Sequence, residues 1–210
     1  MAAGKRLTDM LKPFVYRRYL DFGVFESLRD MKHKIALEVK RKSMGDDIKL
    51  GPGGIREIEF FGQVFQLIRG GVTPDLQNRR IRSVLKLLVQ EGYIEAGVCA
   101  ELIDAYHFLR NTEHRLQEFN DQQTHKLPRE PVDKRRLALS MGFPDWDAYL
   151  GELDVHRNNV QTHFSNLLET NEPEAGDCEG GSAGDDLACL WQDIDTGNPS
   201  LSALSRSGYA

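Results

Sequence analysis

A glycine-rich segment that leads into a long apolar helix constrains this chain more than any other feature. Three glycines and a proline occupy positions 51–54, directly before a helical pattern that runs to about Arg69 and ends at Gly70 and Gly71. Glycine tolerates positive φ values and lets backbone N–H groups crowd together, so we predict a tight turn at the helix start. The helix is apolar around most of its circumference, which is typical of a central, buried helix.

The polar residues of this helix fall on one narrow stripe. Arg56, Glu59, Gln63 and Gln66 are separated by steps of three, four and three residues. We predict that the stripe faces either a polar cleft or the polar groups of another helix. A helix N-terminus carries partial positive charge and N–H groups that favour phosphate or carboxylate. Two interpretations are therefore open: a turn that lines an active cleft, and a helix start held by ordinary salt bridges.

The candidate site residues surround this turn. We predict phosphate or nucleotide contacts from Lys49, Gly53, Gly54 and Arg56, and supporting polar roles for Glu57, Glu59 and Gln63. Lys49 could reach an anion as a point charge, and Arg56 could bind one through two hydrogen bonds. The glycines would allow close backbone approach, and the carboxylates could orient the cations or reach a metal-bound water. Alternatively, Arg56, Glu59 and Gln63 form an internal polar ladder along a buried helix.

The rest of the chain is also helical in its periodicity, and no segment alternates with period two for long enough to be a confident strand. We predict further helices over residues 25–42, 76–90, 96–119, 131–141 and 145–169. Pro131 suits a first helical turn, Asp145 a helix N-cap and Gly92 a helix C-cap. The predicted fold class is all-α, a bundle of about six helices.

Glu113 interrupts the apolar stripe of the helix predicted over residues 96–119. An unpaired buried carboxylate is costly, so Glu113 should find a cation. Arg110, three residues earlier on the same helix, is the partner we favour, and Arg56 is the alternative. The stretch 121–125 that follows is either a polar loop near the site or, as we favour, a helix exit.

Charge and composition exclude several classes of protein. Residues after Thr170 carry a net charge of −7, which leaves +2 for residues 1–170 out of the total of −5, so a general nucleic-acid binder is not expected. No apolar run approaches membrane-spanning length, and the N-terminus lacks the apolar core of a signal peptide. Three cysteines without CxxC spacing suit a reduced, cytoplasmic setting. The six histidines have no metal-ligand spacing, so no metal site is predicted.

The composition also predicts a boundary near Thr170. Residues 171–186 are rich in glycine and acids, which is typical of a flexible linker. We therefore predict a helical domain over residues 1–170, a linker over 171–186, and the truncated start of a further helical segment over 187–210. The abrupt end soon after Leu204 indicates a fragment boundary.

Several stretches of the chain resemble, in the same order, the family of bifunctional glutamine synthetase adenylyltransferase/adenylyl-removing enzymes. These stretches are residues 11–21, 27–32, 47–60, 63–71, 105–110 and 121–128. The resemblance runs from about Leu7 to Leu168 and identifies the chain with the helical part of the N-terminal, adenylyl-removing half. The PII-uridylyltransferase family has a similar Lys-x-Gly-Pro-Gly-Gly turn and is the enzyme alternative. A stand-alone helical protein-interaction module without catalysis is the alternative of another class.

The resemblance implies a parent nucleotidyltransferase that adds AMP to a tyrosine of glutamine synthetase and removes it, in this half by phosphorolysis. It further implies ATP, Mg²⁺ bound by acids of a Gly-Ser-x-x-Asp-x-Asp motif, and regulation by the PII signal protein and glutamine. That motif is absent from this chain and, in the family, would precede it. We therefore expect no catalytic residues, no metal ligands and no activity in this chain alone.

Overall fold

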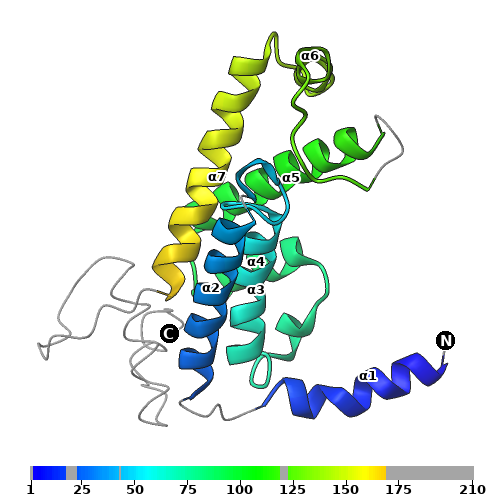
Figure 1. Cartoon of the computed structure of the whole chain (residues 1–210). Coiled ribbons are helices and arrows are strands. Elements are labelled where there is room, and N and C mark those ends of the chain that lie inside the picture. The colour runs from blue at the N-terminus through cyan, green and yellow to red at the C-terminus, as the bar shows by residue number, and fades with distance from the viewer. Residues whose placement is uncertain (1, 18–22, 43, 119–122, 169–210) are drawn as a thin grey trace, which may run out of the picture. The chain divides into compact units, whose positions relative to one another are not determined.

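The computed structural model, shown in Figure 1, describes residues 2–17, 23–42, 44–118 and 123–168. Its α-helices are α1 (Ala2–Val15), α2 (Gly23–Arg41), α3 (Ile55–Arg69), α4 (Ile81–Gln90), α5 (Ala96–Glu118), α6 (Pro131–Ser140) and α7 (Trp146–Leu168), and its 3-10 helices are η1 (Met44–Asp46) and η2 (Pro74–Gln77). Extended backbone within these ranges pairs only at an isolated antiparallel bridge between Asp47 and Lys126. The all-α prediction is confirmed. The predicted linker, 171–186, and the segment 187–210 lie outside the described residues.

Helix α3 lies at the centre of the fold, as its apolar circumference predicted. It contacts α4, α5, α7 and η2, and Figure 1 shows α3 among these helices. Its buried apolar side chains are Ile55, Ile58, Phe61, Val64 and Phe65. A Cβ atom at Gly62 would lie 2.3 Å from Cδ1 of Ile81, so this glycine lets α4 approach closely.

Helices α5 and α7 form the most extensive helix pair, and Tyr149 lies at their contact. Its ring is fully buried and stacks on Phe108, with ring centroids 5.7 Å apart. The Tyr149 hydroxyl donates a hydrogen bond to Oγ1 of Thr112 at 3.3 Å. Burial raises the pKa of Tyr149 to about 12, although the hydrogen bond to Thr112 opposes this shift. The long α7 is thus anchored to α5 near its N-terminal end.

The predicted helix ends are largely confirmed. Pro131 begins α6, and the Asp145 carboxylate accepts a hydrogen bond from the backbone N–H of Ala148 at 2.8 Å as the N-cap of α7. Gly92 follows the C-cap of α4 with a φ of 74°. The described helices include none that is long and apolar enough to cross a membrane.

One predicted helix start is wrong, because the helix predicted over 76–90 begins only at Ile81. Leu76 instead belongs to η2, and Arg80 has an extended backbone. The amide of Gln66 on α3 donates to the backbone carbonyls of Leu76 and Asn78 at 2.6 and 2.7 Å. These carbonyls are the acceptors that an earlier helix start would need, so α3 delays the start of α4.

Helix α1 was not among the predicted helices. Pro13 lies inside it, near its C-terminal end, where a proline removes one helical hydrogen bond. The helix exposes five large apolar side chains, those of Leu7, Met10, Leu11, Phe14 and Val15. The seven α-helices therefore comprise the six predicted ones and α1.

Candidate functional site

The glycine-rich turn between η1 and α3 is closed by hydrogen bonds to Asp47. Its carboxylate accepts from the backbone N–H groups of Lys49 and Leu50 at 2.9 and 2.7 Å. The backbone carbonyl of Asp47 accepts from the N–H of Gly51 at 2.9 Å. Asp47 is only 5% exposed, so this aspartate is an internal support of the turn.

The N–H groups at the start of α3 are bonded within the chain. The N–H groups of Ile55 and Arg56 donate to the carbonyls of Ile48 and Lys49 at 3.2 and 3.1 Å. The N–H of Gly53 donates to Oε2 of Glu57 at 2.9 Å. A phosphate at this helix start would therefore have to displace one of these bonds or bind through side chains. The phosphate role of the turn stays a prediction.

Glu57 lies near the N-terminus of α3 and holds the glycine-rich turn through its hydrogen bond to the N–H of Gly53. Burial raises the pKa of the Glu57 carboxyl above its ordinary value, and the hydrogen bond from the Gly53 N–H partly offsets that rise. A side chain that reaches back to cap a preceding N–H stabilises a helix start. Glu57 thus stabilises the turn by accepting the hydrogen bond from the Gly53 N–H. Its described hydrogen bonds and ion pairs do not include Lys49 or Arg56.

The two glycines before α3 are needed for the packing of the chain itself. Gly53 has a φ of 64°, and a Cβ atom there would lie 2.3 Å from the backbone oxygen of Arg157 on α7. A Cβ atom at Gly54 would lie 2.8 Å from the backbone oxygens of Gly51 and Lys49. At Gly53 the close neighbour in this structure is helix α7, and the approach of a phosphate to these glycines stays a prediction.

Beside the turn, Arg110 connects three side chains. Its guanidinium donates to Oε2 of Glu113 and Oε1 of Glu59, each at 2.7 Å, and to the hydroxyl of Tyr106 at 3.1 Å. Nζ of Lys49 lies 3.2 Å from Oε1 of Glu113. We call these five residues the Arg110 cluster. It links the glycine-rich turn, α3 and α5 through side chains whose formal charges balance.

Glu113 is the buried member of the Arg110 cluster, with a side chain that is 4% exposed. Burial opposes its ionisation, but the hydrogen bonds from Arg110 and Lys49 outweigh burial and lower the pKa of its carboxyl. Burial likewise opposes the charge of Arg110, yet the hydrogen bonds with Glu113 and Tyr106 raise the pKa of its guanidinium. The prediction that Arg110 pairs with Glu113 is confirmed.

The polar stripe of α3 does not act as one unit. Arg56 donates to the backbone carbonyl of Leu50 at 3.3 Å, and the structure gives it no ion pair within the described residues. Glu59 turns to Arg110, Gln63 is exposed, and Gln66 bonds to the η2 region. The described contacts therefore contain no ladder of Arg56, Glu59 and Gln63, and Arg110 takes the place of Arg56 as the cation.

Residues 123–128 lie against the glycine-rich turn, which the favoured interpretation as a helix exit did not include. The N–H of Ile48 donates to the carbonyl of His125 at 2.9 Å, and the N–H of Leu127 donates to the carbonyl of Asp46 at 2.9 Å. Nδ1 of His125 lies 3.1 Å from Oε1 of Glu113, but the two are not oriented for a hydrogen bond, and this buried nitrogen has no hydrogen-bond partner. Residues 123–125 thus form a loop beside the turn, as the alternative interpretation predicted. The stretch 121–122 lies outside the described residues.

Arg157 on α7 is the residue at this site that the sequence did not reveal. Nη1 donates to the carbonyl of Gly45 at 2.8 Å, and Nη2 donates to the carbonyl of Asp47 at 3.0 Å. Burial lowers the pKa of its guanidinium, and its buried Nε has no hydrogen-bond partner. No local sequence signal points to these contacts, because they span more than 100 residues (112 and 110).

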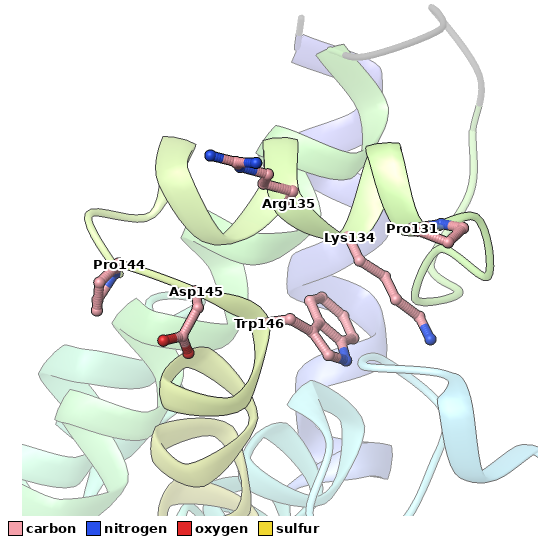
Figure 2. Close-up of a pocket in the computed structure, with 6 residues that line it drawn as sticks. All are labelled: Pro131, Lys134, Arg135, Pro144, Asp145 and Trp146. Carbon is pink, nitrogen blue, oxygen red and sulfur yellow. The ribbon is translucent and has the colours of Figure 1, made fainter.

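A pocket of about 410 Å³ lies elsewhere on this body, where α6 and α7 begin (Figure 2). It is lined by Pro131, Lys134, Arg135, Pro144, Asp145 and Trp146. Nζ of Lys134 lies 5.6 Å from the centre of the Trp146 ring, which is a cation–π contact. Asp145 is already engaged as the N-cap of α7. No predicted site residue lines this pocket.

Comparison with known proteins identifies the family. The model of the family described as GlnD PII-uridylyltransferase matches residues 29–168. The bifunctional glutamine synthetase adenylyltransferase/adenylyl-removing enzyme of Thioalkalivibrio sulfidiphilus is 47% identical over 209 residues, which are 99% of this chain and 22% of that protein. The proteins of the same name from Nitrosococcus oceani and Pseudomonas aeruginosa are 48% and 43% identical over 207 and 208 residues, which are 99% of this chain and 21% of each relative.

The chain thus spans about a fifth of the length of the curated relatives that it matches. Their shared name agrees with the resemblance carried by the glycine-rich turn and the stretches around it, and the uridylyltransferase model matches the same helical region. The chain belongs to the family of bifunctional glutamine synthetase adenylyltransferase/adenylyl-removing enzymes.

Proposed function

We propose that this chain is the helical part of the adenylyl-removing half of an enzyme that adds AMP to glutamine synthetase and removes it. The observation that carries the proposal is the 47% identity over 99% of the chain to an enzyme of that name. The same proposal includes removal of AMP by phosphorolysis, use of ATP, regulation by PII and a cytoplasmic location.

Magnesium would act outside the described part of this chain. Among the described residues, no three His, Cys, Asp or Glu side chains are grouped so that they could hold a metal ion. We therefore assign no step of the reaction to Mg²⁺ here. Its ligands would come from elsewhere in the longer enzyme, which would also supply the catalytic acids.

The role proposed for this chain is to present cations to the phosphate that attacks the adenylyl group, with the tyrosine oxygen as the leaving group and ADP as the product. Lys49 and Arg56 flank the glycine-rich turn, and both side chains are partly exposed. Lys49 is held by Glu113 at 3.2 Å, whereas the described contacts of Arg56 are with a backbone carbonyl. Phosphoryl transfer is promoted chiefly by positioned charges that stabilise the transition state. Arg56, whose charge no described carboxylate pairs, is the first candidate.

The test is Arg56→Ala in the full-length enzyme. We expect the rate of AMP removal to fall by a factor on the order of 10²–10³, by analogy with the loss of one positioned charge-stabilising donor. The assay supplies adenylylated glutamine synthetase, phosphate and magnesium and follows ADP, and thermal melts of the same protein report its stability. Arg115→Ala is the matched control, because within the described residues Arg115 forms an ion pair only with the exposed Glu118 on the same helix. A large fall in melting temperature with a near-normal rate of AMP removal per folded molecule would show that Arg56 has no functional role of this kind.

The match of residues 29–168 to the PII-uridylyltransferase model supports a second candidate, the helical domain of an enzyme that acts on PII. The two candidates differ in substrate. Release of UMP from uridylylated PII by the full-length enzyme, without any action on adenylylated glutamine synthetase, would favour the second.

A further inference from the structure

We propose that Arg157 is the positioning residue of the glycine-rich turn, so that helix α7 sets the placement of Lys49. The inference rests on the proposed function for its consequence in the reaction, but its structural part can be tested without that function. Arg157 acts through the backbone of the turn and is not itself a contact to phosphate.

The first observation is the pair of acceptors that Arg157 holds. The two ends of its guanidinium donate to the carbonyls of Gly45 and Asp47 at 2.8 and 3.0 Å. A planar guanidinium presents its donors in a fixed fork, so two simultaneous bonds fix both distance and orientation. Lysine has the same charge but cannot reproduce that fork.

The second observation is the connection from Asp47 to Lys49. Arg157 holds the carbonyl of Asp47, and the carboxylate of the same residue accepts from the N–H groups of Lys49 and Leu50. Because Asp47 accepts all three bonds and is buried, a shift of this residue would break them. The backbone of Lys49 is thereby fixed from α7, while its side chain is fixed by Glu113 on α5.

The third observation is that the turn meets α7 at Arg157 a second time. A Cβ atom at Gly53 would lie 2.3 Å from the oxygen and 2.6 Å from Cα of Arg157. The side chain of Arg157 thus holds the beginning of the turn while its backbone abuts the end. A displacement of α7 at this residue would have to move both ends of the turn.

Arg157 is half-buried, and the environment of its Nε supports a specific role. Its Nε is buried without a hydrogen-bond partner, and its two described acceptors are neutral carbonyls. Partial burial of a cation is costly unless hydrogen bonds and nearby charges offset the loss of water, and the charges of Asp154, Asp46 and Asp47 offset it only in part here. We therefore infer that the Arg157 side chain serves to hold the backbone of the turn in place, and not to form an ion pair.

The structural test uses amide hydrogen exchange in the 210-residue chain. Arg157→Met should make the N–H groups of Lys49 and Leu50 exchange at least about tenfold faster, because a hydrogen bond from a charged donor is worth that factor or more. The N–H groups of the buried α4 residues Leu85 and Leu88 serve as an internal reference and should change less than about twofold. Arg115→Met is the control variant. Turn N–H groups that exchange within about twofold of the wild-type rates would overturn the proposal.

If Arg157→Met does not fold, Arg157→Lys decides the same question. It keeps the charge and most of the stem, so the body should remain folded while the turn N–H groups exchange about threefold faster or more. Unchanged exchange of those N–H groups in this variant would equally overturn the proposal.

The functional test is a double-mutant cycle in the full-length enzyme. Arg157→Lys should raise the KM for phosphate in AMP removal about tenfold, and this rise should be absent when Lys49 is already Met. Equal rises in both backgrounds would contradict an action through Lys49. If Lys49→Met alone leaves removal unchanged, the phosphate role of Lys49 fails, while the exchange experiment still decides whether Arg157 positions the turn.

Discussion

Replacing Arg110 by methionine should lower the free energy of unfolding by about 3 kcal/mol at pH 7, because it leaves Glu113 buried with a weaker partner. Removing one member of a buried ion pair costs about 3–5 kcal/mol. The lower end applies here because Nζ of Lys49 remains 3.2 Å from Glu113. Glu59 is 34% exposed, so the loss of its contact with Arg110 adds less than about 1 kcal/mol.

The pH dependence of this effect follows from the lowered pKa of Glu113. A carboxyl whose folded-state pKa lies below its unfolded value stabilises the fold above the unfolded value, about 4.3 for glutamate, and loses this contribution as the pH falls through the folded-state pKa. Arg110→Met removes the stronger of the hydrogen bonds that lower this pKa, so burial should then raise it. The stability difference between wild type and variant should therefore be largest near neutral pH and shrink as the pH falls below about 5.

Urea unfolding followed by circular dichroism measures this prediction. The proteins compared with the wild type are Arg110→Met, Glu113→Gln and the double variant, with Arg115→Met as the control. The exposed Arg115 pair should be worth less than about 1 kcal/mol. The double variant should be more stable than the sum of the two single losses predicts, by about 1–3 kcal/mol. A loss below about 1 kcal/mol for Arg110→Met, or strict additivity, would refute the reasoning.

Three other predictions concern the glycine-rich turn, the boundary near residue 170 and the activity of the chain alone. Gly53→Ala should lower the free energy of unfolding by more than about 2 kcal/mol in chemical denaturation. Gly92→Ala, at a similar φ of 74° but in open space, should lower it by about 1 kcal/mol. Equal losses would contradict the contact of Gly53 with α7. Limited proteolysis should cut within residues 171–186 and leave a core that ends near residue 170; protection there with cleavage inside the body would move the boundary. The chain alone should release no ADP from adenylylated glutamine synthetase with phosphate and magnesium, and turnover abolished by a chelator would show that it contains catalytic residues.

The fold was predictable where local chemistry decides the structure. Pro131, Asp145 and Gly92 mark helix ends by backbone preferences that act within a few residues. The start of α4 was not predictable in this way, because Gln66 on another helix takes the carbonyls that an earlier start would use. Helix α1 was not predicted, and Pro13 near its C-terminal end is a residue that disfavours helix.

The same distinction applies to the candidate site. The pairing of Arg110 with Glu113 follows from their spacing of three residues on one helix. Arg157 could not be assigned to the turn, because its partners lie 112 and 110 residues away in the sequence and no periodicity joins them. A place near the site for His125 was only one of two alternatives, because sequence spacing does not show that its carbonyl bonds to Ile48. The phosphate contacts predicted for Lys49, Gly53, Gly54 and Arg56 came from the turn and the family resemblance, and they stay predictions.

The contacts that hold the glycine-rich turn also determine when it can form. Arg157 reaches Gly45 across 112 residues, and Lys49 reaches Glu113 across 64. Closing loops of this length costs entropy that is offset only once α5 and α7 are in place. We therefore expect the turn to be completed late in folding and to open early in unfolding. Substitutions there should speed unfolding far more than they slow folding, so the region beside the candidate site governs the kinetic lifetime of the native state.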